Sequence, residues 1–472
     1  RPGRIINVSS GVTQAAVRGV SPYATSKIAL EGLTRNLACD ADGTGIMVTC
    51  IQVGSTRTPM AKRFFKWEEY ELLPPPECLA PVFWYAATAD PSLLHGRIIA
   101  SWRFNLVGEA EPRLAMPIAG VERFTFGEKP AERYGRAEPI VLNRAENQLG
   151  APPAVRELLG TASASEVWRY PDMDYTVLRC MLAEKLQLGR DCLTFGNGSA
   201  ELVERILRVL VKPGEAVLSN DPSWFMFDRF AHMFGIVNEK VPFVPHASDG
   251  YSHNLDGILA AIRGDTRLIY LIHPSNPVGV PLLHDEFAAF LARVPAHIPV
   301  VVDEAYIEFA NHPRALDTPR LLRETGRMLI GLRTFSKFYG LAGMRVGYGY
   351  ASPDVIRLLG RLELPFNVSS VSAAAAVAAL KDEAHAARTR ENCIAERARI
   401  GEFLRAVDLD YVPTQGNMMM FEPPTEPQAF YGHLEKERIV PPRGVFLGKY
   451  TLWPIALPPH NDRMMAVVRS LV

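Results

Sequence analysis

The sequence predicts an α/β protein that consists of two units joined by a linker. Short apolar runs alternate with helical patterns over residues 1–104 and again from residue 141 onward, which favours parallel sheets covered by helices. Between these stretches, residues 105–140 contain four prolines and repeated charges without steady periodicity, which is typical of a linker or entry arm. A chain of 472 residues is also too long for one ordinary hydrophobic core.

In the first unit, apolar strands are expected at residues 5–8, 45–51 and 96–100, with helices between them. The first strand follows Arg1-Pro2-Gly3-Arg4 with no initiator methionine and no leading helix. This start is typical of a sequence that begins inside a domain. We therefore expect a piece of a longer fused protein.

In the second unit, continuous apolar runs predict buried strands at residues 267–272 and 299–303. From about residue 371, alanine-rich helices and a polar meander replace the regular alternation, which predicts a smaller α+β domain. We expect a large α/β domain over about residues 165–370. The small domain should comprise residues 371–472 together with the arm that begins at residue 141.

Composition limits the classes of partner. Hydrophobic residues make up 48% of the chain and charged residues 22%, and the formal net charge is zero, so nothing in the charge balance points to nucleic acid or a membrane surface. The six cysteines have no metal-ligand spacing and are interpreted as reduced thiols, and no metal site is predicted. Without an apolar run of membrane-spanning length or a signal peptide, we expect a cytoplasmic protein that acts on small molecules.

The first unit contains a tyrosine and a lysine four residues apart. Tyr23 and Lys27 would lie one above the other on a helix, where the ammonium favours the phenolate. Ser10, at the end of the first strand, could orient the same substrate oxygen during proton exchange with an alcohol or carbonyl. Alone, the spacing fits an ordinary amphipathic helix equally well.

Three segments in order resemble the short-chain dehydrogenase/reductase family: residues 5–10, the helix with Tyr23 and Lys27, and residues 54–60. The resemblance covers residues 1–104 and implies the C-terminal half of a Rossmann fold. The half that carries the glycine-rich dinucleotide loop is absent, and Val53 replaces a usual proline. This unit is therefore expected to be inactive as it stands, and NAD(P) is a cofactor only if the missing half is present.

The strongest pattern in the second unit surrounds Lys337. An amine can condense with an aldehyde cofactor, and Thr334, Ser336 and Arg345 nearby can neutralise a phosphate. Ser199 precedes an amphipathic helix whose N-terminus also suits a phosphate, although Ser199 could be a plain helix cap.

Asp303 should emerge at the carboxyl end of an apolar strand, where α/β sheets bind ligands. A protonated pyridine nitrogen is the kind of cation that this carboxylate requires. Tyr306 and Asn276 could bond a phenolic oxygen of such a cofactor, with turn chemistry as the alternative role of Asn276. Trp224 offers a flat face for stacking, with a core position as its alternative.

Six motifs from residue 142 onward together resemble the fold-type I aminotransferases, most closely the histidinol-phosphate aminotransferase branch. They lie at residues 142–147, 169–172, 196–201, 273–279 and 303–306 and around Lys337. The resemblance covers residues 140–472 and implies pyridoxal 5′-phosphate as cofactor, with Ala200 beside its phosphate. It also implies a homodimer in which Tyr170 reaches the neighbouring subunit's cofactor phosphate. The implied reaction is ping-pong amino transfer in which Lys337 moves the proton.

The sequence departs from this family in several places. Leu452 stands where the family usually carries an arginine that binds the substrate's carboxylate or phosphate. We therefore expect either a less acidic ketone or aldehyde acceptor, or an acidic group that is bound by another side chain such as Arg443. Ala200 and Val278 are also unusual, and Met418–Met420 are interpreted mainly as core filling. A decarboxylase of a phosphorylated amino acid and a non-catalytic scaffold with a retained cofactor cradle remain alternatives. A fused dehydrogenase could make or consume the carbonyl compound.

Overall fold

The structure is a computed structural model that describes residues 3–14, 21–57, 61, 73, 76–101, 139–161, 168–248 and 250–472. The chain divides into two compact units, Arg1–Ala115 and Met116–Val472. Each unit has its own hydrophobic core. The predicted linker at residues 105–140 lies almost entirely outside the described residues.

The first unit is a three-stranded parallel sheet in the order β1-β2-β3. Its central strand β2 is buried almost throughout, whereas the edge strand β1 leaves Ile5 and Val8 exposed. The elements of this unit are β1 Arg4–Ser10, η1 Gly11–Gln14, α1 Ser21–Ala41, β2 Met47–Val53, η3 Pro76–Leu79, α3 Ala80–Thr88, α4 Pro91–Leu94 and β3 Ile98–Ala100.

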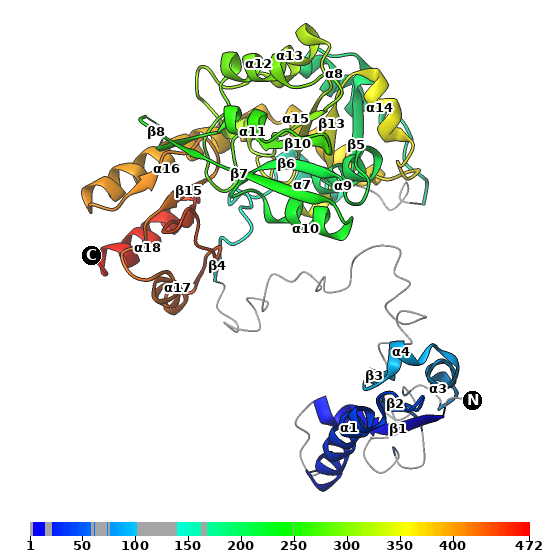
Figure 1. Cartoon of the computed structure of the whole chain (residues 1–472). Coiled ribbons are helices and arrows are strands. Elements are labelled where there is room, and N and C mark those ends of the chain that lie inside the picture. The colour runs from blue at the N-terminus through cyan, green and yellow to red at the C-terminus, as the bar shows by residue number, and fades with distance from the viewer. Residues whose placement is uncertain are drawn as a thin grey trace. The chain divides into compact units, whose positions relative to one another are not determined.

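The second unit is built on a seven-stranded sheet in the order β5-β13-β12-β11-β10-β6-β7 (Figure 1). Its strands are β5 Leu193–Gly196, β6 Ala216–Asp221, β7 Val237–Pro242, β10 Thr266–Ile272, β11 Val300–Asp303, β12 Leu329–Thr334 and β13 Gly347–Tyr350. Neighbouring strands from β7 to β12 are parallel, and β13 is antiparallel to both β12 and β5. The sequence pattern did not indicate this reversal. It occurs because residues 335–346 connect β12 to β13 without a crossover α-helix.

Helices cover both faces of this sheet, and α12 and α13 lie on the opposite side from α10 (Figure 1). Alternation along the strands divides the apolar side chains between the two faces, so Val302 packs on one side and Val301 on the other. The helices of the large layer are α7 Pro153–Thr161, α8 Thr176–Leu186, α9 Ser199–Leu210, α10 Phe225–Met233, α11 Leu255–Ala260, α12 His284–Arg293, α13 Thr318–Thr325, α14 Pro353–Gly360 and α15 Ser370–Lys381, with η5 Arg190–Cys192, η6 Ile307–Phe309 and η7 Ala342–Met344.

The last part of the chain forms a second, antiparallel sheet in the order β14-β15-β17. The short strand β4, which precedes the large layer in sequence, pairs in parallel with β16 near the end of the chain. The elements involved are β4 Ile140–Val141, α16 Glu383–Ala406, β14 Tyr411–Val412, β15 Met418–Phe421, α17 Pro427–Lys436, β16 Ile439–Val440, β17 Thr451–Pro454 and α18 Pro458–Arg469, and a separate hairpin joins β8 Val244–His246 to β9 Gly250–Ser252. After β4, the side chain of Asn147 donates to the carbonyl of Phe338 at 2.8 Å, which holds the arm against the large layer.

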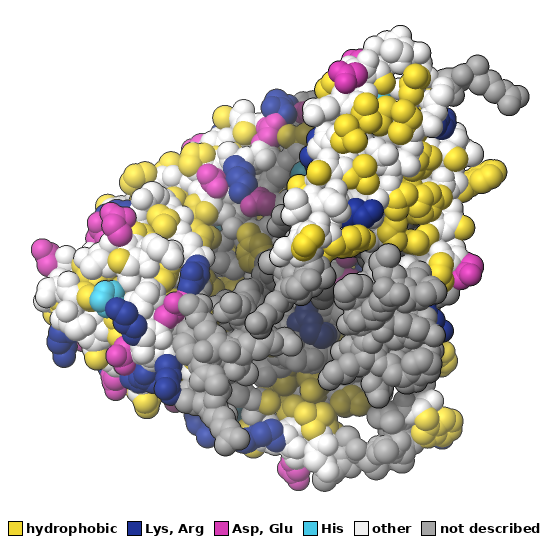
Figure 2. All heavy atoms as spheres, turned by 90° about the horizontal axis from the view of Figure 1, so that it is seen from below, with side chains coloured by type: hydrophobic (Ala, Val, Ile, Leu, Met, Phe, Trp, Pro, Cys, Tyr) yellow, Lys and Arg dark blue, Asp and Glu magenta, His cyan; other side chains and the backbone are white. Residues whose placement is uncertain are grey.

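The described surface carries both signs of charge. On the face drawn in Figure 2, lysine and arginine side chains are interspersed with aspartate and glutamate over the described atoms. Within the described residues, none of the helices is both long and apolar enough to cross a membrane. The same residues contain no group of three histidine, cysteine or acidic side chains placed to hold a metal ion.

Candidate active site

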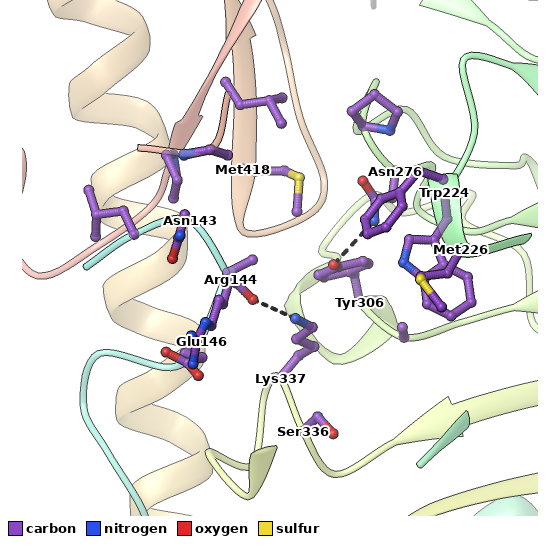
Figure 3. A pocket seen from close by; sticks show the side chains of 18 of the residues that line it. Asn143, Arg144, Glu146, Trp224, Met226, Asn276, Tyr306, Ser336, Lys337 and Met418 are labelled. Carbon is purple, nitrogen blue, oxygen red and sulfur yellow. Dashed lines mark hydrogen bonds between the residues drawn. The ribbon is translucent and has the colours of Figure 1, made fainter. Parts of the chain in front are cut away.

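A cavity of about 1110 Å³ lies at the carboxyl ends of β10, β11 and β12 (Figure 3). The large layer provides one wall, and β15, β17 and the segment after β16 provide the other. Parallel strands present their carboxyl ends at one edge of a sheet, so side chains far apart in sequence meet there. Among the lining residues are Asn143, Arg144, Ser199, Ala200, Trp224, Met226, Asn276, Asp303, Tyr306, Thr334, Ser336, Lys337, Arg345, Met418, Arg443, Phe446, Leu452 and Pro454.

Lys337 follows β12 and extends into this cavity. Its Nζ donates a hydrogen bond to the backbone carbonyl of Arg144 at 2.7 Å and lies 6.0 Å from the centre of the Tyr306 ring (Figure 3). Burial, opposed by Glu146 and aided by Arg345, lowers the pKa of Lys337 to about 8. The amine is therefore closer to its neutral, nucleophilic form at physiological pH than an exposed lysine is.

Asp303 ends β11 as a buried carboxyl group. The hydroxyl of Tyr270 donates to one of its oxygens at 2.7 Å, and the backbone N–H of Ala305 donates to the other at 3.0 Å. No lysine or arginine among the described residues forms an ion pair with this carboxylate. Burial raises the pKa of Asp303 to about 6, against the effect of the Tyr270 bond. The site thus holds a desolvated carboxyl group that lacks a cation.

Tyr306 and Asn276 meet on the opposite side of Lys337 from the arm. The side-chain amide of Asn276 donates to the Tyr306 hydroxyl at 3.3 Å (Figure 3). Burial, together with Asp303, raises the pKa of Tyr306 well above its usual value, so the phenol keeps its proton. Trp224 occupies the N-cap position of α10 without a side-chain cap bond, and it lines the cavity together with Met226.

The floor below Lys337 is lined with hydrogen-bond donors. The Ser336 hydroxyl lies 3.0 Å from that of Thr334 and accepts a bond from the Arg345 guanidinium at 3.2 Å. The same guanidinium donates to the carbonyl of Asn197 at 3.2 Å, just before the N-terminus of α9. Hydroxyls, a guanidinium and a helix N-terminus together suit a phosphate group.

Gly198 permits this close approach of Arg345 to α9. Its φ is +79°, and a Cβ at this position would collide with Nη2 of Arg345. Gly198 is the N-cap residue and no side chain caps the helix, so Ser199 is the first helical residue. The alternative role of Ser199 as a plain helix cap is therefore wrong.

The wall opposite the large layer is mostly apolar. Leu452 in β17 is buried and lines the cavity together with Met418, Phe446 and Pro454. Arg443 also lines the cavity, but its guanidinium is paired with Glu435 and lies over the ring of Tyr431. Met418–Met420 are all buried in the hydrophobic core, in agreement with their interpretation as core filling, and Met418 also lines this cavity.

The structure brings ten of the eleven residues predicted for the cofactor to one cavity: Ser199, Ala200, Trp224, Asn276, Asp303, Tyr306, Thr334, Ser336, Lys337 and Arg345. Tyr170 is not among the lining residues. It is highly exposed and stacks on Phe366 with ring centres 4.3 Å apart.

In the first unit, Ser10 ends β1 and Tyr23 and Lys27 lie on α1, as predicted. Lys27 Nζ lies 5.7 Å from the centre of the Tyr23 ring and donates to the carbonyl of Val8 at 2.8 Å. Within the described part of this unit, no hydrogen bond joins Ser10 to Tyr23. The third segment of the resemblance, residues 54–60, lies partly outside the described residues.

Sequence reasoning did not single out Tyr270, Arg144 or Asn143 individually. Tyr270 carried a signal, because a hydroxyl inside an otherwise apolar strand requires a partner when it is buried. Arg144 acts through its backbone carbonyl, which no sequence pattern marks. Asn143 lines the cavity, and its Oδ1 is buried without a hydrogen-bond partner.

Comparisons with known proteins match both units. Residues 137–448 match the family model described as aminotransferase class I and II, and residues 1–69 match that of short chain dehydrogenase. A histidinol-phosphate aminotransferase 2 of Ralstonia nicotianae is 38% identical over 339 residues, which are 71% of this chain and 89% of the relative. One of Akkermansia muciniphila is 36% identical, over 73% of this chain and 94% of the relative.

Solved structures show the same likeness. The crystal structure of histidinol-phosphate aminotransferase from Sinorhizobium meliloti in complex with pyridoxal-5′-phosphate has a TM-score of 0.69 and 27% identity. The match covers 77% of the present chain and 99% of the Sinorhizobium meliloti chain.

Proposed function

Because this chain belongs to the class I and II aminotransferase family, close to the histidinol-phosphate aminotransferases, we propose that it is a pyridoxal-phosphate-dependent aminotransferase with Lys337 as its central residue. It moves an amino group between an amino donor and a ketone or aldehyde acceptor in a ping-pong reaction. One observation carries this proposal: Lys337, the uncompensated carboxyl group of Asp303 and a phosphate-binding floor line one cavity.

The residues present fit the cofactor at both ends. Ser336, Thr334, Arg345 and the N-terminus of α9 are donors suited to a phosphate dianion. At the other end, the buried carboxyl group of Asp303 lacks a cation, and a protonated pyridine nitrogen provides one. When bound, pyridoxal phosphate supplies the aldehyde that exchanges the amino group and the ring that withdraws electrons from the substrate carbon.

Lys337 performs the proton transfers. Its Nζ, which donates to the carbonyl of Arg144, would hold the cofactor's aldehyde carbon and, as a free amine, would act as a general base and acid at the substrate carbon. A pKa of about 8 suits both roles near neutral pH. Asp303 stays ionised opposite a cation with the help of the Tyr270 hydroxyl, and Tyr306 and Asn276 provide donors for a phenolate oxygen.

The part of the substrate away from the reacting carbon meets an apolar wall. The relatives are named for histidinol phosphate, which carries an acidic group. In this chain Leu452, Met418 and Phe446 form the wall, and Arg443 is already paired with Glu435. We therefore expect substrates without an acidic group at this wall, since a leucine offers nothing to an anion and burial of an unpaired anion is costly.

The proposed assembly is a homodimer with shared active sites. It is supported by Tyr170, which is exposed outside its own cavity and so is available to a neighbouring subunit.

Residues 1–104 are proposed to be the C-terminal half of a dehydrogenase, joined by residues 105–140 to an aminotransferase over 141–472. A cytoplasmic location stays a prediction of the sequence.

The visible spectrum of the purified protein with added pyridoxal phosphate tests this function. The wild type should develop the absorption band of lysine-bound pyridoxal phosphate, and the Lys337→Ala variant should not. Lys381→Ala, which removes an exposed lysine on α15, is the matched control and should behave like the wild type. If the wild type shows no such band, the catalytic proposal fails and the scaffold alternative takes its place.

A panel of amino donors then defines the substrate. Donors whose far end carries no acidic group should bleach the band, whereas histidinol phosphate, whose phosphate would meet the apolar wall, should do so more than tenfold less efficiently. The reverse order would refute the apolar-wall argument but not the aminotransfer itself. Release of carbon dioxide with retention of the amino group would identify the decarboxylase alternative.

A further inference from the structure

The turn that leads into α9, residues 197–199, forms part of the phosphate-binding floor. Ser199 lines the active-site cavity, and the carbonyl of Asn197 accepts a hydrogen bond from Arg345 at 3.2 Å. Gly198 is the N-cap residue and provides no side chain to bond the N–H groups of the first helical turn. The position of this turn therefore depends on bonds that other residues make to it.

Glu201, in the first turn of α9, is the centre of a hydrogen-bond network around this turn. Its Oε2 accepts from the backbone N–H of Asn197 at 2.8 Å and from the Asn197 side chain at 3.1 Å. The side-chain amide of Asn367 donates to both carboxylate oxygens, at 2.8 and 2.9 Å, and Arg205 donates to Oε1 at 2.6 Å. A glutamate at this place also interacts favourably with the helix dipole.

Asn367 holds the same turn from a distant part of the sequence. Its backbone carbonyl and its Oδ1 accept from the Asn197 side chain, at 3.0 and 2.7 Å. Asn197 is thus fixed by Glu201 through its backbone and by Asn367 through its side chain. These bonds determine where the residue that accepts from Arg345 lies.

The charge of Glu201 has a second effect on this site. Burial opposes its ionisation, but the donors from Asn197, Asn367 and Arg205 lower its pKa below the usual value, so it remains a carboxylate. A carboxylate near a phosphate site repels the dianion. Arg205, which is almost fully buried and also pairs with Glu363, offsets part of this charge. Positioning of the turn and repulsion of the phosphate therefore act in opposite directions.

We propose that Glu201 and Asn367 are positioning residues for the phosphate group of the cofactor, an inference that rests on the proposed function. Neither side chain is among those that line the active-site cavity, so both act through Asn197. Their bonds hold the carbonyl of Asn197 where Arg345 reaches it and keep the N-terminus of α9 at the wall of the cavity. Loss of either residue should weaken the binding of the phosphate and leave the ring end of the site, at Asp303, unchanged.

Absorbance titration of the full-length apoprotein with pyridoxal phosphate, and separately with pyridoxal, which lacks the phosphate, tests this role. In Glu201→Gln and in Asn367→Ala, the dissociation constant of pyridoxal phosphate should rise about 10- to 100-fold, because bonds to a charged group are lost. The dissociation constant of pyridoxal should change less than about twofold, since its binding does not use this turn. A merely structural defect would weaken both ligands alike, so the ratio of the two constants isolates the positioning effect.

The two variants complement each other. Asn367→Ala leaves the charge of Glu201 in place, so it reports the positioning of the turn without a change in repulsion. Glu204→Gln is the matched control, because it removes the same charge from the same helix, where Glu204 pairs instead with Arg208. This control should bind both ligands like the wild type.

Three outcomes would overturn the proposal: equal losses for the two ligands, an unchanged affinity for pyridoxal phosphate in both variants, or a tighter affinity in Glu201→Gln. The last would show that repulsion by the carboxylate outweighs its positioning of the turn. A wild type that develops no visible band would instead refute the proposed function itself, and this inference with it.

Discussion

Asp303→Asn should stabilise the protein without its cofactor, although it should impair the function. In the folded apoprotein, burial raises the pKa of this carboxyl group from 3.8 to about 6. In the unfolded chain the group ionises with its ordinary pKa. At a pH above the ordinary pKa of 3.8, folding therefore either buries the charge of Asp303 or requires the uptake of a proton.

The size of this penalty follows from the shift. Roughly two pKa units, each worth ~1.4 kcal/mol, give a free-energy cost of about 3 kcal/mol. The cost is absent below pH ~4, grows as the pH rises towards 6, and is complete above pH ~7. An asparagine removes the charge but is a poorer hydrogen-bond partner for the Tyr270 hydroxyl and the Ala305 N–H, which reduces the gain in folding free energy by about 1 kcal/mol. A net gain of about 2 kcal/mol is expected at pH 8, and none at pH 4.

Urea unfolding of the apoproteins at fixed concentration, from pH 4 to pH 8, measures this difference. Asp174→Asn, at an exposed aspartate, is the control and should show no pH-dependent gain. Saturating pyridoxal phosphate should reverse the order, because the cation then stabilises only the wild type. If the difference between Asp303→Asn and the wild type does not change with pH, Asp303 is not a desolvated carboxyl group awaiting a cation and the reasoning fails.

Three further outcomes are expected. Tyr270→Phe removes the donor that stabilises the ionised Asp303, so the dissociation constant of pyridoxal phosphate should rise about 10- to 100-fold in an absorbance titration; an unchanged constant would contradict the role given to Tyr270. Gly198→Ala should also weaken cofactor binding, because the added Cβ collides with Arg345. Gly214→Ala, at a similar positive φ but in open space, should lower only the stability. Equal cofactor affinities in the two variants would contradict the phosphate-binding role given to Arg345. The rate at which the apoprotein regains its visible band should rise with pH and level off near pH 8, since burial lowers the pKa of Lys337 to about 8; a rate that climbs through pH 10 would show an ordinary exposed amine.

Much of the candidate site was predictable because its residues lie at marked places in regular elements. Asp303 ends an apolar strand, Ser199 starts an amphipathic helix, and Lys337 lies among hydroxyls that follow a strand. In a parallel sheet such positions converge at one edge without further information. Tyr270 was missed because its role depends on the register between β10 and β11, which places Tyr270 and Asp303 on the same face of the sheet.

The burial of Arg397 could not have been predicted in this way. Arg397 lies within the long helix α16, and its sequence neighbours suggest a solvated charge. Only the packing of α16 against the segments around Asn311 and Thr414 buries the guanidinium and leaves Nη1 without a partner. Burial of a charge is a property of tertiary neighbours, not of local pattern.

The sequence by itself determined the two α/β units, the family of the second unit, and many of the groups that line the active-site cavity, because strand and helix periodicity and the motifs can be recognised along the chain. The tertiary structure decided the reversed direction of β13, the pKa directions of Asp303 and Lys337, the apolar wall around Leu452 and the uncompensated charge of Arg397. Each of these depends on which distant groups surround a side chain and exclude water from it, and that arrangement arises only when the folded chain brings them together.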